Sequence, residues 1–184
     1  MELPTRLVLP THLDLANRSD RTGILHLYLL THATELTKST NTGALIAPAL
    51  AEHPDIKVHR VLWSRVAPDP RLIEDTGLAL IYPALDAKTL SSDAGSLPRD
   101  IQGVILLDAT WQLAQKMYNQ SPYLKQLPAY QLASAIPSVY RLRRNQRQLG
   151  WCTAECAAMV LGSFGAHQAA EAVMQQFLLF NSSQ

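Results

Sequence analysis

The sequence has little cysteine. It holds two cysteines in 184 residues, Cys152 and Cys156. Two sulfurs in a chain of this length do not make a disulfide framework. They lie four positions apart on an expected helix, without clustered histidines, whereas a structural zinc site needs four sulfur or imidazole ligands. We therefore expect both cysteines to pack as small apolar side chains, and we expect no bound metal.

Long apolar runs are also missing. No stretch approaches the roughly 20 apolar residues that span a bilayer. Prolines and polar residues interrupt the N-terminal segment MELPTRLVLPTHLDL, which therefore does not resemble a signal peptide. These absences predict a cytoplasmic protein with no membrane partner.

The chain has no strong excess of either charge. Its formal net charge is +1, so the overall charge does not indicate nucleic-acid binding, and any RNA surface has to come from local clustering. One basic cluster follows Tyr140 and contains Arg141, Arg143 and Arg144. Arginines contact phosphates and an aromatic ring stacks on bases, so we predict RNA binding by these four residues. The alternative is a solvated basic loop.

Length and composition favour one domain. An apolar content of 47% over 184 residues is enough for a sizeable core, and we predict a single domain over residues 1–184. Residues 1–22 lack a clean hydrophobic period and are expected to be an N-terminal extension of it.

The most informative stretch runs from Gly103 to Pro122. Its apolar residues 104–107 predict a buried strand. Helical spacing of apolar residues follows from Trp111 onward, until Ser121 and Pro122 end the helix. Asp108 therefore stands between a strand's carboxyl end and a helix's positive end. Ligands of open α/β sheets bind outside such strand ends. Asp108 is then either a site residue or merely a helix cap, a role that Thr110 also suits.

Similar apolar segments recur along the chain. Strands are expected at residues 24–30, 56–62, 78–82 and 130–133, and helices at 153–161 and 166–180, whereas residues 89–100 are expected to form a surface loop. The sequence Thr40–Gly43 is expected to begin a further short helix that Pro48 limits. Alternating strands and helices predict an α/β domain with a mostly parallel sheet and flanking helices.

Several stretches together resemble one protein family. Asp108-Ala109-Thr110-Trp111 matches the D-x-T-W signature of the DTW domain family. Other stretches resemble the family in the same order: 39–43 (STNTG), 81–87 (IYPALDA), 121–124 (SPYL), 140–144 (YRLRR) and 152–155 (CTAE). The resemblance runs from about Arg21 to Leu161. Many family members also carry an N-terminal cysteine cluster suited to zinc, and nothing in this sequence corresponds to it.

The resemblance implies a fold and an activity. The family is similar to SPOUT-like RNA-modifying proteins, which implies a C-terminal trefoil knot that no periodicity argument yields. Characterised members transfer the 3-amino-3-carboxypropyl group of S-adenosylmethionine to a uridine in tRNA and release 5′-methylthioadenosine, and a related branch acts on ribosomal RNA. S-adenosylmethionine as co-substrate and tRNA as partner are therefore expected. The particular RNA, the modified position and the oligomeric state stay open.

The same resemblance suggests which residues form the site. We expect Asp108 to be the catalytic base or to orient the reactants, since the uracil imide has to lose a proton. The cofactor-binding residues are expected to be Thr42, Gly43, Tyr82, Pro83, Leu107, Thr110, Trp111, Thr153 and Glu155. Two alternatives remain, namely a SPOUT-type RNA methyltransferase that uses the same cofactor and a non-catalytic RNA-binding module.

Overall fold

The computed structural model describes residues 23–91, 96–133, 138–140 and 150–183. Six strands form one sheet in the order β2-β1-β5-β3-β6-β4, and each pairing within it is parallel. The strands are β1 Leu25–Thr31, β2 Ile56–Leu62, β3 Leu78–Ile81, β4 Lys88–Leu90, β5 Gly103–Asp108 and β6 Ala129–Leu132. The predicted α/β class and its parallel sheet are confirmed.

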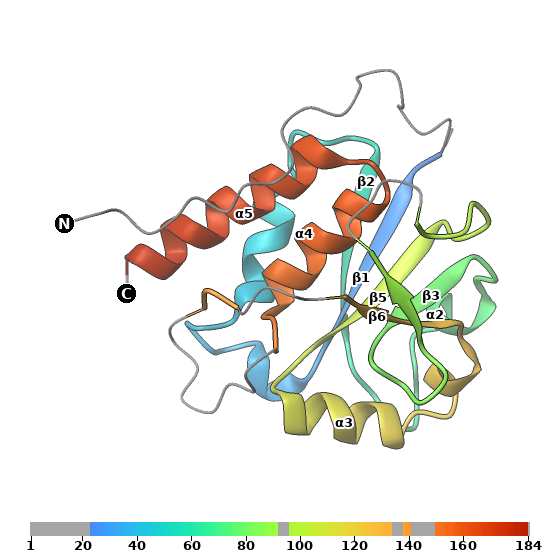
Figure 1. Ribbon diagram of the computed structural model, residues 1–184. Helices are drawn as coiled ribbons and strands as arrows, with labels where there is room; N and C mark the ends of the chain where they lie inside the picture. Colours follow the sequence, from blue (N-terminus) through green and yellow to red (C-terminus); the bar gives the residue numbers. More distant parts are fainter. Residues whose placement is uncertain (1–22, 92–95, 134–137, 141–149, 184) are drawn as a thin grey trace.

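Helices cover both faces of this sheet. The α-helices are α1 Ile46–Ala49, α2 Arg71–Glu74, α3 Trp111–Asn119, α4 Thr153–Ser163 and α5 His167–Ser182. The described residues also form three short 3₁₀ helices: η1 Ala33–Glu35, η2 Thr42–Leu45 and η3 Leu124–Gln126. Figure 1 shows α4 and α5 side by side over one face and α3 on the other side of the sheet.

Two hydrophobic cores follow from this layering. Successive residues of a strand point to opposite faces. In β1, Leu27 and Leu29 pack into the core that contains α4 and α5, whereas Tyr28 and Leu30 pack into the core that contains Ala114 and Met117 of α3. Both faces of the central strands are therefore buried, which explains why their sequences are almost continuously apolar.

The connections reverse direction between β1 and β5. From β1 the chain passes through α1, on the α4–α5 face, to β2 on one side. From β5 it passes through α3, on the opposite face, to β6 on the other side. Adjacent strands whose connections diverge leave a crevice at their carboxyl ends, where α/β proteins bind ligands.

One expected loop is partly wrong. Residues 88–90, which overlap the predicted surface loop 89–100, form the edge strand β4 and pair with β6. Leu90 and Leu97 are buried in the larger core. A three-residue strand has no recognisable period, and only its pairing with the distant β6 makes it a strand.

Two further expectations concern the knot and the membrane. The trefoil knot stays a prediction, since residues 134–137 and 141–149 lie outside the described part of the chain. No helix within the described residues is long and apolar enough to cross a bilayer.

Candidate functional site

The candidate site lies at the carboxyl ends of β1 and β5. Thr31, the last residue of β1, is paired in register with Asp108, the last residue of β5. Asp108 is 1% exposed. A carboxylate at that depth needs compensating hydrogen bonds or charges.

Four described side chains supply that compensation. Asn41 Nδ2 donates to both carboxylate oxygens of Asp108, at 3.2 and 3.0 Å. Thr153 Oγ1 donates to Oδ1 at 3.0 Å, and Thr31 Oγ1 donates to Oδ2 at 3.1 Å. Arg60 Nη2 reaches Oδ2 at 3.4 Å and also donates to Asn41 Oδ1 at 3.3 Å. Asp108 therefore joins β1, β2, the start of η2 and the start of α4.

The helix-cap interpretation of Asp108 is wrong. The N-cap of α3 is Thr110, whose Oγ1 accepts from the backbone N–H of Leu113 at 3.4 Å. Asp108 still belongs to β5, and its carboxylate faces the switch point between β1 and β5. Because α3 begins at Trp111, the residue directly before it, Thr110, takes the capping role.

The predicted loop residues Thr42 and Gly43 lie against this cluster. A Cβ on Gly43 would stand 2.5 Å from Asp108 Oδ1 and 2.6 Å from its Cγ. Glycine at position 43 thus permits a close approach of backbone to the Asp108 carboxylate. Thr42 is buried, and its Oγ1 accepts from the backbone N–H of Ala154 at 3.4 Å. Thr42 fastens η2 to α4, and Gly43 lets η2 pack closely against Asp108 of β5.

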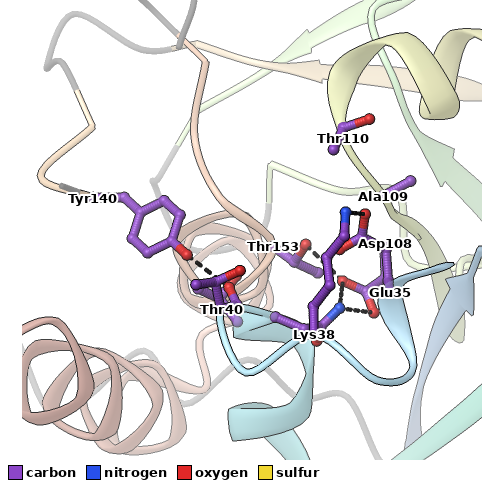
Figure 2. Close-up of a pocket in the computed structure, with 10 residues that line it drawn as sticks. Glu35, Lys38, Thr40, Asp108, Ala109, Thr110, Tyr140 and Thr153 are labelled. Atoms are coloured by element: carbon purple, nitrogen blue, oxygen red, sulfur yellow. Dashed lines mark hydrogen bonds and ion pairs between the residues drawn. The ribbon is translucent and has the colours of Figure 1, made fainter. Parts of the chain in front are cut away.

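A small cavity opens beside Asp108. Its volume is about 70 Å³, and its lining includes Thr40, Thr110, Tyr140 and Thr153 (Figure 2). Tyr140 is 5% exposed and its hydroxyl donates to the Thr40 carbonyl at 2.6 Å, while its ring is tilted against Phe177. That burial does not favour the predicted stacking of Tyr140 on an RNA base.

Two charged residues of the same cavity were not predicted. Glu35, at the end of η1, is 7% exposed, and its Oε1 lies 2.6 Å from the Lys38 ammonium. Figure 2 draws both residues with Asp108 among the side chains that line the cavity. Both residues lie in the polar stretch that follows the end of β1. Polar residues that follow a buried strand are a sequence signal that could have identified them as site candidates.

Aromatic residues gather near the start of α3. The rings of Tyr82 and Trp111 are stacked with centroids 5.8 Å apart, and Tyr82 also stacks on Tyr118 at 4.5 Å. Two predicted residues, Tyr82 and Trp111, are therefore brought together. Pro83 is exposed, and Leu107 packs with the smaller core; neither is among the residues that line the cavity.

Glu155 forms a different set of contacts. Its carboxylate accepts from the backbone N–H of Cys152 at 2.8 Å, which completes a capping box at the start of α4. It also accepts from Ser138 Oγ at 2.6 Å and from the Val139 N–H at 2.9 Å. Glu155 thus fastens residues 138–139 to α4 and is not among the residues that line the cavity.

The remaining predicted residues are three arginines and two cysteines. Arg141, Arg143 and Arg144 lie outside the described residues. Cys152 is buried and Cys156 partly buried in the larger core, as expected, and burial raises the pKa of the Cys152 thiol. Within the described ranges no three histidines, cysteines or acidic residues gather as a metal site.

The sequence did not predict Asn41 and Arg60 as site residues, because nothing local marks a loop amide or a strand arginine as a partner of Asp108.

Comparison with known proteins identifies relatives. The sequence profile of the DTW domain matches residues 9–184. The chain is 26% identical over 138 residues to tRNA-uridine aminocarboxypropyltransferase 2 of Macaca fascicularis, covering 74% of this chain and 46% of that relative. It is 27% identical over 140 residues to the protein of the same name from Mus musculus, with the same coverage. The chain thus spans about half the length of these relatives. No solved structure matches.

Proposed function

This chain belongs to the DTW domain family, and from that premise we propose that it transfers the 3-amino-3-carboxypropyl group of S-adenosylmethionine to a uridine in tRNA, with release of 5′-methylthioadenosine. One observation carries the proposal. The aspartate of the D-x-T-W signature, Asp108, is buried at the switch point of the sheet and forms a wall of a polar cavity.

The described residues fit one end of this co-substrate. Pockets that enclose drug-sized ligands measure about 300–1,000 Å³. The cavity beside Asp108, at about 70 Å³, takes a small polar group rather than the whole molecule. Three threonines, Thr40, Thr110 and Thr153, are among the residues that line it, and threonines suit such a group. Thr110 of the cavity lining directly precedes Trp111, whose ring stacks on Tyr82.

S-adenosylmethionine, when bound, supplies an electrophilic methylene carbon next to its sulfonium. The task of the chain is then to position that carbon against the uracil ring nitrogen. We assign an orienting role to Asp108. Four side chains already donate to its carboxylate, so it holds Asn41 and Thr153 in place at the cavity wall. Trp111 is proposed to exclude water and cover the apolar part of the ligand.

The proposal is tested with two labelled co-substrates. Purified protein is incubated with tRNA and S-adenosylmethionine that carries carbon-14 either in the methyl group or in the carboxyl group. We expect the carboxyl label, and not the methyl label, to appear in RNA, with methylthioadenosine as the co-product. Methyl label in RNA would favour the methyltransferase alternative. Co-substrate binding without any labelled nucleoside would favour a non-catalytic RNA-binding module.

Residues outside the cavity complete the proposal. Arg141, Arg143 and Arg144 are proposed to contact the RNA backbone, because clustered arginines bind phosphates. Arg143→Ala and Arg144→Ala test this role when their RNA affinity is measured at several salt concentrations. Loss of a phosphate contact should lower the RNA affinity and its salt dependence without affecting co-substrate binding.

A further inference from the structure

The cavity beside Asp108 contains a second carboxylate and one ammonium, Glu35 and Lys38, which the proposed function does not yet use. Glu35 is 7% exposed, whereas the Lys38 side chain is 40% exposed. Burying a carboxylate is costly unless a partner compensates for it. Here the compensating ammonium belongs to a long side chain that still reaches solvent. The pair is therefore fixed at its acidic end and movable at its basic end.

Asp108 is less suited than Glu35 to bind a cationic ligand. Its oxygens already accept from Thr31, Asn41, Arg60 and Thr153. Among the described residues that line the cavity, Glu35 is the other carboxylate, and its partner is Lys38. A ligand ammonium can replace Lys38 at Glu35, which frees the lysine ammonium for a ligand anion. Such an exchange keeps each charge paired.

We infer that Glu35 and Lys38 bind the zwitterionic α-amino-acid end of the co-substrate, Glu35 its ammonium and Lys38 its carboxylate. The inference rests on the proposed function. The cavity volume of about 70 Å³ suits an amino-acid head group, and Thr40 and Thr110, which also line the cavity, suit its remaining polar atoms. Lys38 directly precedes the 39–43 loop, so one short segment supplies the cation and the start of η2.

Three adenosyl ligands separate the two roles. S-adenosylhomocysteine carries both the ammonium and the carboxylate, decarboxylated S-adenosylmethionine carries the ammonium without the carboxylate, and 5′-methylthioadenosine carries neither. Binding of each to the full chain is measured by titration calorimetry for wild type, Glu35→Gln and Lys38→Met. Glu74→Gln and Lys57→Met, which remove the same charges from exposed positions, are the matched controls.

We expect both variants to bind S-adenosylhomocysteine at least about ten-fold more weakly than wild type, because each loses a charge-assisted contact. Binding of methylthioadenosine should stay within about two-fold, as should all binding by the controls. Decarboxylated S-adenosylmethionine should be weakened by Glu35→Gln and not by Lys38→Met, since that ligand lacks the carboxylate.

The opposite results would contradict the roles of Glu35 and Lys38. Unchanged binding of S-adenosylhomocysteine in both variants, or an equal loss for methylthioadenosine, would overturn the assignment and leave the proposed function standing. A wild-type chain that binds none of the three ligands would overturn both. If Glu35→Gln does not fold, Lys38→Met decides the question by the ratio of the S-adenosylhomocysteine and methylthioadenosine affinities, because its side chain is 40% exposed and its loss leaves the core intact.

Discussion

At the scale of single residues, Asp108 links parts of the chain that are far apart in sequence. Its partners Thr31, Asn41, Arg60 and Thr153 come from four segments between residues 31 and 153. A buried carboxylate is tolerated only when donors surround it. Asn41 Nδ2 and Thr153 Oγ1 in turn depend on it, because its carboxylate is the acceptor that the described residues give them. Asp108 therefore contributes to stability as well as to the proposed site.

Asp108→Ala should lower the free energy of unfolding by roughly 3 kcal/mol, since Asn41, Thr153 and Arg60 all lose an acceptor. Asp108→Asn keeps the size but puts an amide N–H among donors, and a loss of about 1–2 kcal/mol is expected. Urea denaturation measures both. Asp86→Ala, at an exposed position, should stay within about 0.5 kcal/mol of wild type. A stable Asp108→Ala would contradict the structural role.

Gly43→Ala tests the close approach to Asp108. The added methyl would lie 2.5 Å from Oδ1, so the carboxylate or η2 has to move. We expect a loss of about 1–3 kcal/mol, as for other overpacked interior sites. The matched control is Gly23→Ala, whose methyl would have nothing within 4 Å. Equal thermal melting of the two variants would show that the contact is not tight.

At the scale of secondary-structure elements, the start of α4 is a junction. Thr153 bonds to Asp108, the Ala154 N–H bonds to Thr42, and Glu155 caps the helix and accepts from Ser138 and Val139. Three consecutive residues thus connect α4 to β5, to η2 and to the segment 138–139. The four free N–H groups of a helix start favour such an arrangement.

Glu155→Gln should weaken this junction. The amide that replaces one oxygen cannot accept from an N–H, and the charge-assisted character of the remaining bonds is lost. We expect the free energy of unfolding to fall by about 1–2 kcal/mol, with faster amide hydrogen exchange at Val139 and Cys152. Glu171→Gln, on the exposed side of α5, should alter neither. Unchanged exchange at both amides would argue against the junction.

At the scale of the whole molecule, a stack of aromatic rings connects β1 and the edge strand β2 to α2. His26 and Tyr28 of β1 stack against His59 of β2, with centroid separations from His59 of 5.1 and 4.6 Å. His26 Nδ1 and His59 Nε2 share a hydrogen bond of 2.9 Å, and Arg71 of α2, itself paired with Asp69, lies 3.3 Å from His59 Nδ1. Burial, then His26, then Arg71 lower the pKa of His59 below 6.5.

That shift predicts how stability depends on pH. The folded state binds the His59 proton more weakly than the unfolded state, so stability is fully present above the unfolded pKa of about 6.5 and is lost as the pH falls from there through the folded pKa. Denaturation at a series of pH values should show this decline, and His59→Gln should flatten it. His167→Gln, at an exposed position on α5, should leave it unchanged. Identical slopes in wild type and His59→Gln would exclude the effect.

The sequence by itself determined the buried central strands and the family. Continuous apolar runs predicted β1, β3 and β5, because strands buried on both faces need apolar residues at every position. The D-x-T-W signature and the end of the β5 run together placed Asp108 at a strand's carboxyl end. Each of these conclusions depends on residues that are neighbours in the chain.

The tertiary structure decided which distant residues meet. It set the sheet order, made residues 88–90 an edge strand, and brought Asn41, Arg60 and Thr153 to Asp108. It also placed Glu155 at the junction with residues 138–139, and Glu35 and Lys38 at the cavity. Hydrophobic periods determine which face of an element is buried. They do not determine which other element covers that face, because this depends on strand pairing and packing between segments far apart in the chain.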